Sequence, residues 1–349
     1  MSEQRNTRSF PPSERPALAR NDAAPLALSR FAITVRPDFL MATFRFLATL
    51  ILLSLFSAPV RAVETAAYAI ADSTTGFILD SSGGGKKLQV GSLTKIATAM
   101  VVFDWSEASK TDLGQHATVP GSASALGGAQ GGVGFQPGDR ASVRDLLYAA
   151  LLQSDNQAAE TLADHVGRAL GGGKPVEEFV AQMNALASRL GMTHTRFLNP
   201  HGIDSLERSL PYSTAEDLAK LTQYAMQNAA FRFHVSQKER KITILAAGGE
   251  DSQFLLRNTN ELLGVSGIDG VKTGQTKRAG GCVVISAAKA PLSQAQADGQ
   301  VVVTPRRLNV IVLGSGDRFG VANGLMQRGW QLYDQWAAAG RPPKWKAPR

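Results

Sequence analysis

The sequence predicts an α/β fold of the α+β kind: an antiparallel sheet flanked by helices, with an all-helical subdomain inserted between its strands. Strand-like segments lie over 66–85 and again between 240 and 315, and a series of helical patterns separates them. The chain has 349 residues, of which 44% are hydrophobic, enough for a large buried core. We expect a cleft where the sheet meets the helical subdomain.

The individual elements follow from local patterns. Residues 66–85 read as two short strands with a turn at Ser73–Gly76, and 112–140 read as a long surface loop rich in Gly, Ser and Ala. Ser92 to Glu107 is predicted to be a central helix, because apolar residues cover nearly all its sides. Further helices are predicted over 141–153, 157–170, 176–191, 213–228 and about 317–337, and strands over 240–245, 267–274, 280–288 and 307–315.

Two helix starts carry capping patterns. Ser142 is followed by Asp145, and Ser213 by Glu216, at the spacing of a capping box. Pro291–Val303 is expected to be a longer hairpin connection, and the tail around Trp345 is expected to be disordered.

The N-terminal part predicts export. Residues 46–56, FLATLILLSLF, form an apolar run after Arg45 that is too short to span a bilayer comfortably, and cleavage after Ala62 fits the small residues before it. We interpret 1–62 as a disordered leader plus a secretory signal peptide, with Met41 as a possible true start. Residues 63–349 are then the working domain, outside the cytoplasm.

Charge and cysteine content exclude some functions. The net charge is +8, but residues 1–62 hold eight arginines against four acidic residues, which leaves the remainder weakly basic. No basic cluster is interleaved with aromatic residues, so nucleic acid is not an expected partner. The single cysteine, Cys282, lies in an apolar run and is interpreted as a buried strand residue.

The first candidate catalytic pair is Ser92 and Lys95. Residues three apart on a helix share a face, so the hydroxyl and the amine can meet. If the helix is buried, desolvation lowers the pKa of Lys95, and a neutral amine beside a serine makes the oxygen nucleophilic. Ser286 and Lys289 have the same spacing, but they stand in a strand pattern where residues three apart face opposite ways.

Two further triplets accompany this pair. Ser154-Asp155-Asn156 lies between two helical patterns and, taken alone, favours a helix cap over a catalytic role. Lys272-Thr273-Gly274 lies in a strand pattern, and its glycine allows close approach of a backbone or a ligand. Taken alone, this triplet favours an exposed lysine on an edge strand over a binding role.

S-x-x-K, S-D-N and K-T-G in this order are the motif set of penicillin-recognising serine enzymes. The chain resembles the serine-type D-alanyl-D-alanine carboxypeptidases, the low-molecular-mass penicillin-binding proteins of peptidase family S11, from about Ala66 to Trp336. The resemblance lies in GSLTKIATAM, LLQSDNQAAETLADHVG, LGMTHTRFLNPHGID, STAEDLAKL, RNTNELL and GIDGVKTGQTKRAGGCVVISA. It implies a β-lactamase/transpeptidase-like fold.

The resemblance also implies roles for individual residues. Ser92 would be the acylated nucleophile, Lys95 its base, Ser154 a proton relay, and Asn156 a group that fixes Lys95 and the substrate backbone. Substrate binding would fall to Lys272 and Thr273, which hold the terminal carboxylate, to Gly274, and to the backbone N–H of Gln275, which with that of Ser92 forms the oxyanion hole. No metal or organic cofactor is expected.

The implied substrates are peptidoglycan stem peptides ending in D-Ala-D-Ala, with β-lactams as covalent inhibitors, in cell-wall biogenesis in the periplasm. Related enzymes cut crosslinks as endopeptidases, and the motifs do not separate the two activities. Relatives with a membrane anchor carry a second domain and an amphipathic C-terminal helix. Only about ten residues follow the last predicted helix here, so a single soluble domain without a stable membrane anchor is expected.

Three other functions share part of these sequence features. A class A β-lactamase would have Glu-x-x-x-Asn, whereas Thr195 stands four residues before Asn199. A penicillin-binding module that turns over slowly shares all three motifs. A zinc peptidase using His194, His201 and Asp204 lacks a second ligand cluster.

Overall fold

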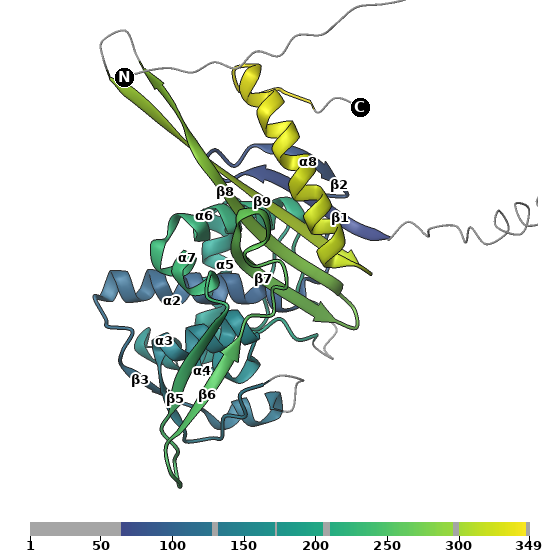
Figure 1. Cartoon of the computed structure of the whole chain (residues 1–349). Helices are drawn as coiled ribbons and strands as arrows, with labels where there is room; N and C mark the ends of the chain where they lie inside the picture. The colour runs from purple at the N-terminus through teal and green to yellow at the C-terminus, as the bar shows by residue number, and fades with distance from the viewer. Residues whose placement is uncertain (1–63, 128–131, 172, 205–209, 296–299, 347–349) are drawn as a thin grey trace, which may run out of the picture. The chain divides into compact units, whose positions relative to one another are not determined.

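The computed structural model describes residues 64–127, 132–171, 173–204, 210–295 and 300–346 (Figure 1). The predicted leader and signal peptide, 1–62, lie outside the described residues. The strands are β1 (Thr65–Asp72), β2 (Ile78–Ser82), β3 (His116–Thr118), β4 (Arg140–Ser142), β5 (Glu239–Ile244), β6 (Ser252–Arg257), β7 (Ile268–Thr276), β8 (Gly280–Ala295) and β9 (Val301–Ser315). The α-helices are α2 (Lys95–Ser109), α3 (Val143–Tyr148), α4 (Asn156–Ala169), α5 (Pro175–Arg189), α6 (Ala215–Gln227), α7 (Ala229–Val235) and α8 (Arg318–Ala338).

The main sheet joins the two ends of the described chain. Its strand order is β2-β1-β9-β8-β7, and every neighbouring pair is antiparallel. In this order β1 lies between β2 and β9, with Ile70 opposite Val310. The helices α2 to α7 are inserted between the N-terminal and C-terminal strands, which confirms the predicted fold class. The inserted part is not all-helical as predicted, because it also holds the two-stranded sheets β3-β4 and β5-β6.

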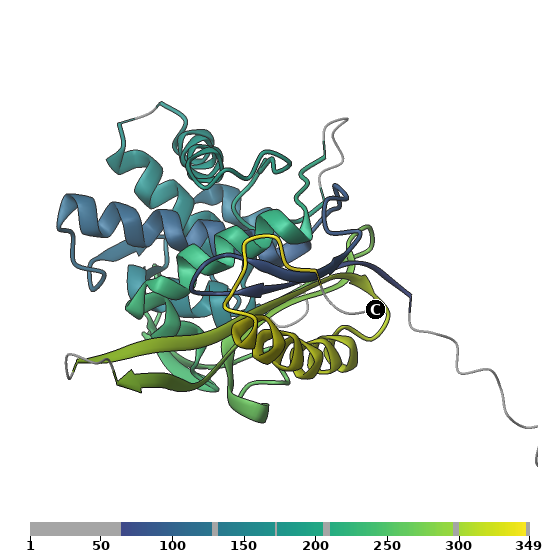
Figure 2. The ribbon, with the colours of Figure 1, turned by 90° about the horizontal axis from the view of Figure 1, so that it is seen from above.

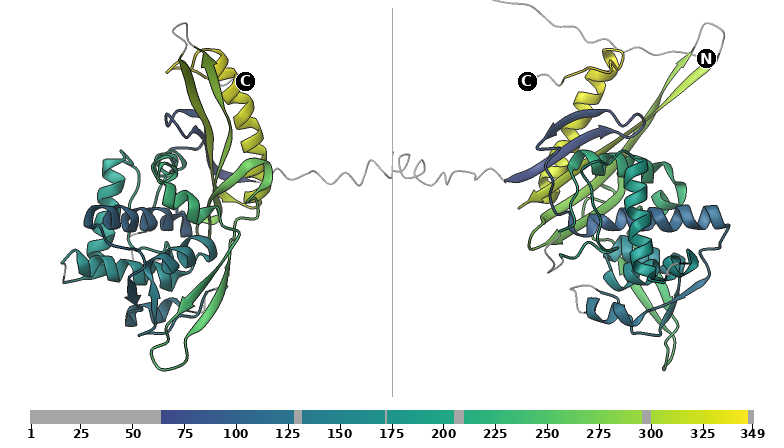
Figure 3. Two further views of the ribbon diagram at one scale, coloured as in Figure 1. Left: turned by 60° about the vertical axis from the view of Figure 1, so that its left-hand side comes forward. Right: turned by 180° about the vertical axis from the view of Figure 1, so that it is seen from behind.

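Each face of the sheet carries its own core. On one face α8 packs Met326, Tyr333 and Trp336 against strand residues such as Leu308 and Val310. On the opposite face the helices α2 to α7 form the larger core. Figures 2 and 3 show α8 on one side of the sheet and the other helices on the other. The tail prediction was wrong for Trp345, which is partly buried against the α8 core.

Helix α2 is the centre of the helical part. Every residue from Lys95 to Phe103 is buried, so the helix has no solvent-facing stripe over that stretch. A short 3-10 turn, Gly91–Thr94, precedes α2. Helical backbone therefore begins near Ser92 as predicted, but its first turn is of the tighter 3-10 type.

Other predictions need correction. Residues 112–140, predicted to be a surface loop, contain β3, the 3-10 segment Gly121–Leu126 and the start of β4. The two strands form because Ala117 pairs with Ala141 and both side chains are buried in the core. The connection predicted at Pro291–Val303 is largely strand, since β8 and β9 stay paired as far as Ala295 and Val301. Helix α7 and strand β6 were not predicted from the sequence.

The two capping predictions differ in outcome. Ser142 caps α3 by accepting a hydrogen bond from the N–H of Asp145, as predicted. Helix α6 is capped one residue later than predicted, by Thr214, whose hydroxyl accepts from the N–H of Asp217 at 3.0 Å. Ser213 instead pairs with Leu88 through backbone hydrogen bonds, which removes it from the cap.

Candidate active site

Ser92 and Lys95 meet at the junction of the 3-10 turn and α2. The Nζ of Lys95 lies 3.0 Å from the Oγ of Ser92. Gly91 before them has φ of +53°, a conformation that glycine adopts readily, and a β-carbon there would lie 3.3 Å from the backbone nitrogen of Gln275. The close approach therefore places Ser92 beside the end of β7.

Lys95 has two further contacts. Its Nζ lies 2.7 Å from Oδ1 of Asn156 and 2.8 Å from the carbonyl oxygen of His201. The side chain is 0% exposed, and burial lowers its pKa to about 7, against a smaller opposing effect of the Asp155 carboxylate. Near neutral pH the amine is therefore present in both protonation states.

The three contacts determine how a neutral Lys95 is oriented. A neutral amine has two N–H donors and one lone pair, and the oxygens of Asn156 and His201 only accept. Both N–H groups are used there, so the lone pair faces the third partner, the Ser92 hydroxyl. This is the arrangement in which the amine takes the hydroxyl proton.

The S-D-N triplet occupies a turn between helices. A π-helical segment, Ala149–Gln153, ends at Ser154, which has φ of +66°. Asp155 caps α4 by accepting from the N–H of Ala158 at 2.7 Å, and it also accepts from the N–H of Val133 at 2.7 Å. The cap hypothesis is therefore right for Asp155, while Asn156, the first residue of α4, contacts Lys95.

The K-T-G triplet lies on β7, the edge strand of the main sheet. Lys272 is 1% exposed, so the alternative of a solvent-exposed edge lysine is wrong. Burial, with Lys95 and Arg318 adding to it, holds its pKa well below the usual lysine range. Its Nζ donates to the carbonyl oxygen of Thr273 at 3.0 Å, and the hydroxyls of Thr273 and Thr259 lie 2.6 Å apart.

Gly274 has a steric reason to be glycine. A β-carbon at this position would lie 2.8 Å from the carbonyl oxygen of Val90 and 3.2 Å from the backbone nitrogen of Leu93. The absent side chain lets β7 lie against the 3-10 turn that carries Ser92, which is the close backbone approach predicted for this glycine.

Arg318 is a site residue that sequence reasoning missed. Its Nη1 donates to the carbonyl oxygen of Gly274 and to Oε1 of Gln275, both at 3.0 Å. It begins α8, more than 40 residues after the motif, and no local pattern marks it. A surface cavity of about 470 Å³ opens beside these residues, lined by Gln275, Ser315, Asp317, Arg318, Phe319 and four glycines.

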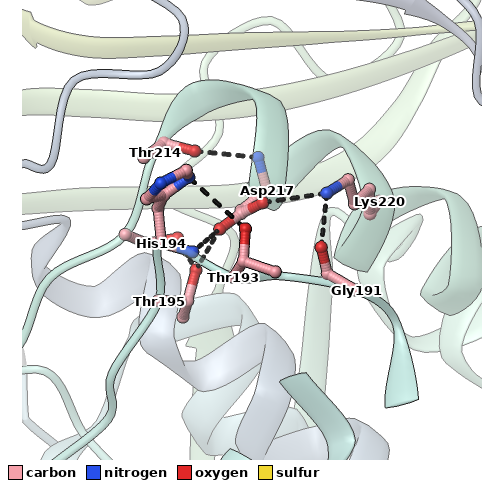
Figure 4. Close-up of polar contacts among 8 residues, drawn as sticks. Gly191, Thr193, His194, Thr195, Thr214, Asp217 and Lys220 are labelled. Carbon is pink, nitrogen blue, oxygen red and sulfur yellow. Dashed lines mark hydrogen bonds and ion pairs between the residues drawn. The ribbon is translucent and has the colours of Figure 1, made fainter. Parts of the chain in front are cut away.

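The segment 191–203, which brings the His201 carbonyl to Lys95, is attached to α6 (Figure 4). The buried carboxylate of Asp217 accepts from the N–H of His194 at 2.8 Å and from the hydroxyl of Thr195 at 3.0 Å. Its other oxygen accepts from Lys220 at 3.1 Å, and Lys220 also donates to the carbonyl oxygen of Gly191. The hydroxyl of Thr195 thus helps to attach the segment 191–203 to α6.

Other candidates lie apart from this group. Cys282 is fully buried, and burial raises the pKa of its thiol to about 11. Ser286 is buried and donates to the carbonyl of Leu308, while Lys289 stands over the ring of Trp330. Within the part of the chain that the structure describes, no three His, Cys, Asp or Glu side chains are grouped to hold a metal ion, and no helix is long and apolar enough to span a membrane.

The chain is similar to known proteins over most of its length. The family model of peptidase S11, D-alanyl-D-alanine carboxypeptidase, matches residues 55–296. The D-alanyl-D-alanine carboxypeptidase DacC of Escherichia coli is 30% identical over 281 residues, 78% of this chain and 62% of that protein. A D-alanyl-D-alanine endopeptidase of Pseudomonas aeruginosa is 34% identical over 219 residues, 62% of this chain and 64% of that protein.

A solved structure is similar over most of the chain. The crystal structure of the Streptomyces K15 DD-transpeptidase aligns with a TM-score of 0.65 at 29% identity, covering 77% of this chain and 98% of that one. The chain spans a little under two thirds of the length of the two curated relatives.

Proposed function

Because the chain belongs to peptidase family S11, the D-alanyl-D-alanine carboxypeptidases, we propose that it is a serine D,D-carboxypeptidase acting in cell-wall biogenesis. Its substrates are peptidoglycan stem peptides ending in D-Ala-D-Ala, and it works outside the cytoplasm, in the periplasm. The observation that carries the proposal is the buried contact of Lys95 with Ser92, Asn156 and His201.

The acylation step follows from that contact. The Oγ of Ser92 attacks the carbonyl carbon of the penultimate D-Ala, and its proton passes to the lone pair of Lys95. The backbone N–H groups of Ser92 and Gln275 stabilise the oxyanion of the tetrahedral intermediate. The C–N bond then breaks, and the proton reaches the leaving amine through Ser154.

The leaving D-Ala carries a carboxylate, which Lys272, Thr273 and Arg318 bind in this proposal. The lowered pKa of Lys272 reduces its charged fraction, so the guanidinium of Arg318 supplies the permanent positive charge. Asn156 holds Lys95 and the substrate backbone. Water then hydrolyses the acyl-enzyme, and the mechanism uses no metal or organic cofactor.

β-Lactams resemble the terminal dipeptide and acylate the same serine in this proposal. The experiment is to incubate the purified protein with a stem pentapeptide and with a fluorescent penicillin. We expect free D-Ala from the pentapeptide and labelling at Ser92, with both lost in Ser92→Ala. Equal labelling of Ser92→Ala and the wild type, with no D-Ala from either, would end the proposal.

A second candidate activity is D,D-endopeptidase cleavage of crosslinks, because the Pseudomonas aeruginosa endopeptidase is 34% identical over the aligned region. A crosslinked muropeptide dimer distinguishes the two activities. Monomer release faster than D-Ala release at equal substrate concentration would favour the endopeptidase. Rapid penicillin hydrolysis without either product would instead identify a β-lactamase.

A further inference from the structure

One peptide group connects Lys95 to the turn at 199–203. The carbonyl oxygen of His201 lies 2.8 Å from Nζ of Lys95. The N–H of the same peptide, on Gly202, donates to Oδ1 of Asn199 at 2.6 Å. In a trans peptide the C=O and N–H point in opposite directions, so Asn199 holds one edge of the peptide and the other edge faces Lys95.

The Asn199 side chain also closes the turn. Its Nδ2 donates to the carbonyl oxygen of Ile203 at 3.1 Å, and the N–H of Ile203 donates to Nδ1 of His201 at 3.1 Å. The preceding carbonyl, on Pro200, accepts from the hydroxyl of Thr98 at 2.5 Å. The turn is therefore fixed by side chains on both sides of the His201 carbonyl.

Packing prevents the turn from moving toward the serine. Gly202 has φ of +79°, and a β-carbon there would collide with the carbonyl of Gly91, the residue before Ser92. The peptide that follows the His201 α-carbon thus lies directly against the backbone of the nucleophile's turn, and a small rotation of that peptide changes the acceptor that Lys95 meets.

We propose that Asn199 is a positioning residue: by holding the His201–Gly202 peptide it directs the His201 carbonyl at Lys95 and so keeps the amine's lone pair on Ser92. The proposal rests on the proposed function, in which Lys95 is the base. Asn199 touches neither the substrate nor the reacting atoms in this role. It acts through one peptide group.

The charged and titratable groups that face Lys95 come from three elements. They are Asp155 at the start of α4, Lys272 on β7 and His201 in the turn. Burial lowers the pKa of His201 to about 3, so this imidazole stays neutral across the range in which Lys95 titrates. Of the two buried lysines, Lys95 is the one that meets the peptide held by Asn199, so we assign a change in the pH profile of an Asn199 variant to Lys95.

The test is the rate of acylation of the full-length protein by a fluorescent penicillin, measured from pH 6 to pH 9. Asn199→Ala removes the acceptor for Gly202 N–H, and we expect its plateau rate at high pH to fall at least tenfold. Asn199→Asp keeps an acceptor oxygen, so its plateau stays within about threefold of the wild type. Its added carboxylate favours charged Lys95 and moves the acid limb to higher pH.

Asn184 provides the matched control. It holds the same segment with two bonds of the same kind, to the N–H and the carbonyl oxygen of Phe197, both at 2.9 Å. Asn184→Ala is expected to lower thermal stability and to leave the plateau rate within about twofold. Equal plateau rates for the two alanine variants would overturn the proposal.

The remaining outcomes are also decisive. If Asn199→Ala does not fold, the test uses Asn199→Asp instead. A tenfold loss of the plateau acylation rate in Asn199→Asp would contradict the role of the acceptor oxygen. If the wild type is not labelled at Ser92, the proposed function fails first. If the wild type is labelled at Ser92 and both Asn199 variants keep the wild-type acylation rate and pH profile, the positioning role of Asn199 is refuted and the proposed function stands.

Discussion

The pH dependence of acylation follows from the burial of Lys95. Because burial brings the pKa of this lysine to about 7, its neutral fraction rises from roughly one tenth at pH 6 to roughly nine tenths at pH 8. If Lys95 is the base, the acylation rate by a fluorescent penicillin rises about tenfold over the same range and then levels off.

Asp155→Asn tests the electrostatic part of that reasoning. The Asp155 carboxylate favours the charged form of Lys95, so removing its charge lowers the lysine pKa and moves the acid limb of the acylation profile to lower pH. The asparagine oxygen still accepts from the N–H of Ala158, which keeps the α4 cap. Wild-type rates that are flat from pH 6 to pH 8, or a limb above pH 9, would refute Lys95 as a buried base.

Three further changes test other parts of the structure. Gly274→Ala places a β-carbon 2.8 Å from the Val90 carbonyl, and we expect at least tenfold slower acylation, measured with the same penicillin; an unchanged rate would show that β7 does not need this approach. Asp217→Asn weakens the ion pair with Lys220 and is expected to lower the free energy of unfolding by about 1–3 kcal/mol in urea, whereas no change in the urea midpoint would contradict its anchoring role. Lys95 gains its proton below about pH 7 when folded and below about pH 10.5 when unfolded, so the unfolded state binds more protons between these values and stability rises with pH. The difference between the unfolding free energies of the wild type and Lys95→Met should therefore change in favour of the wild type by about 1.4 kcal/mol per pH unit from pH 7 to pH 10. Parallel curves of unfolding free energy against pH for the two proteins would argue against a buried, neutral lysine.

Local patterns were sufficient for most elements. The apolar coverage of residues 92–107 predicted a central helix, and Lys95 to Phe103 are indeed buried. The Ser142 cap was readable because a capping box needs only residues three apart. The α6 cap was misplaced by one residue, since both Ser213 and Thr214 suit a cap, and the pairing of Ser213 with distant Leu88 decides between them.

The surface loop and the hairpin connection were mispredicted for a related reason. Short strands such as β3 and β4 have too few residues for a clear alternation, and they exist because they pair with each other. In the same way, β8 and β9 extend each other beyond the core, where Ser293 pairs with Val303 and Ala295 with Val301. Pairing partners supply backbone hydrogen bonds that no single segment reveals.

By itself the sequence determined the candidate nucleophile, its lysine, the two triplets and the α+β order of elements, because these depend on residue types at short spacings. The tertiary structure alone decided what surrounds Lys95. The His201 carbonyl comes from 106 positions away, and backbone carbonyls have no signature in a sequence. Arg318 reaches Gly274 from the start of α8. Desolvation and hydrogen-bond orientation depend on where distant segments pack, so the protonation and direction of the amine are properties of the folded chain.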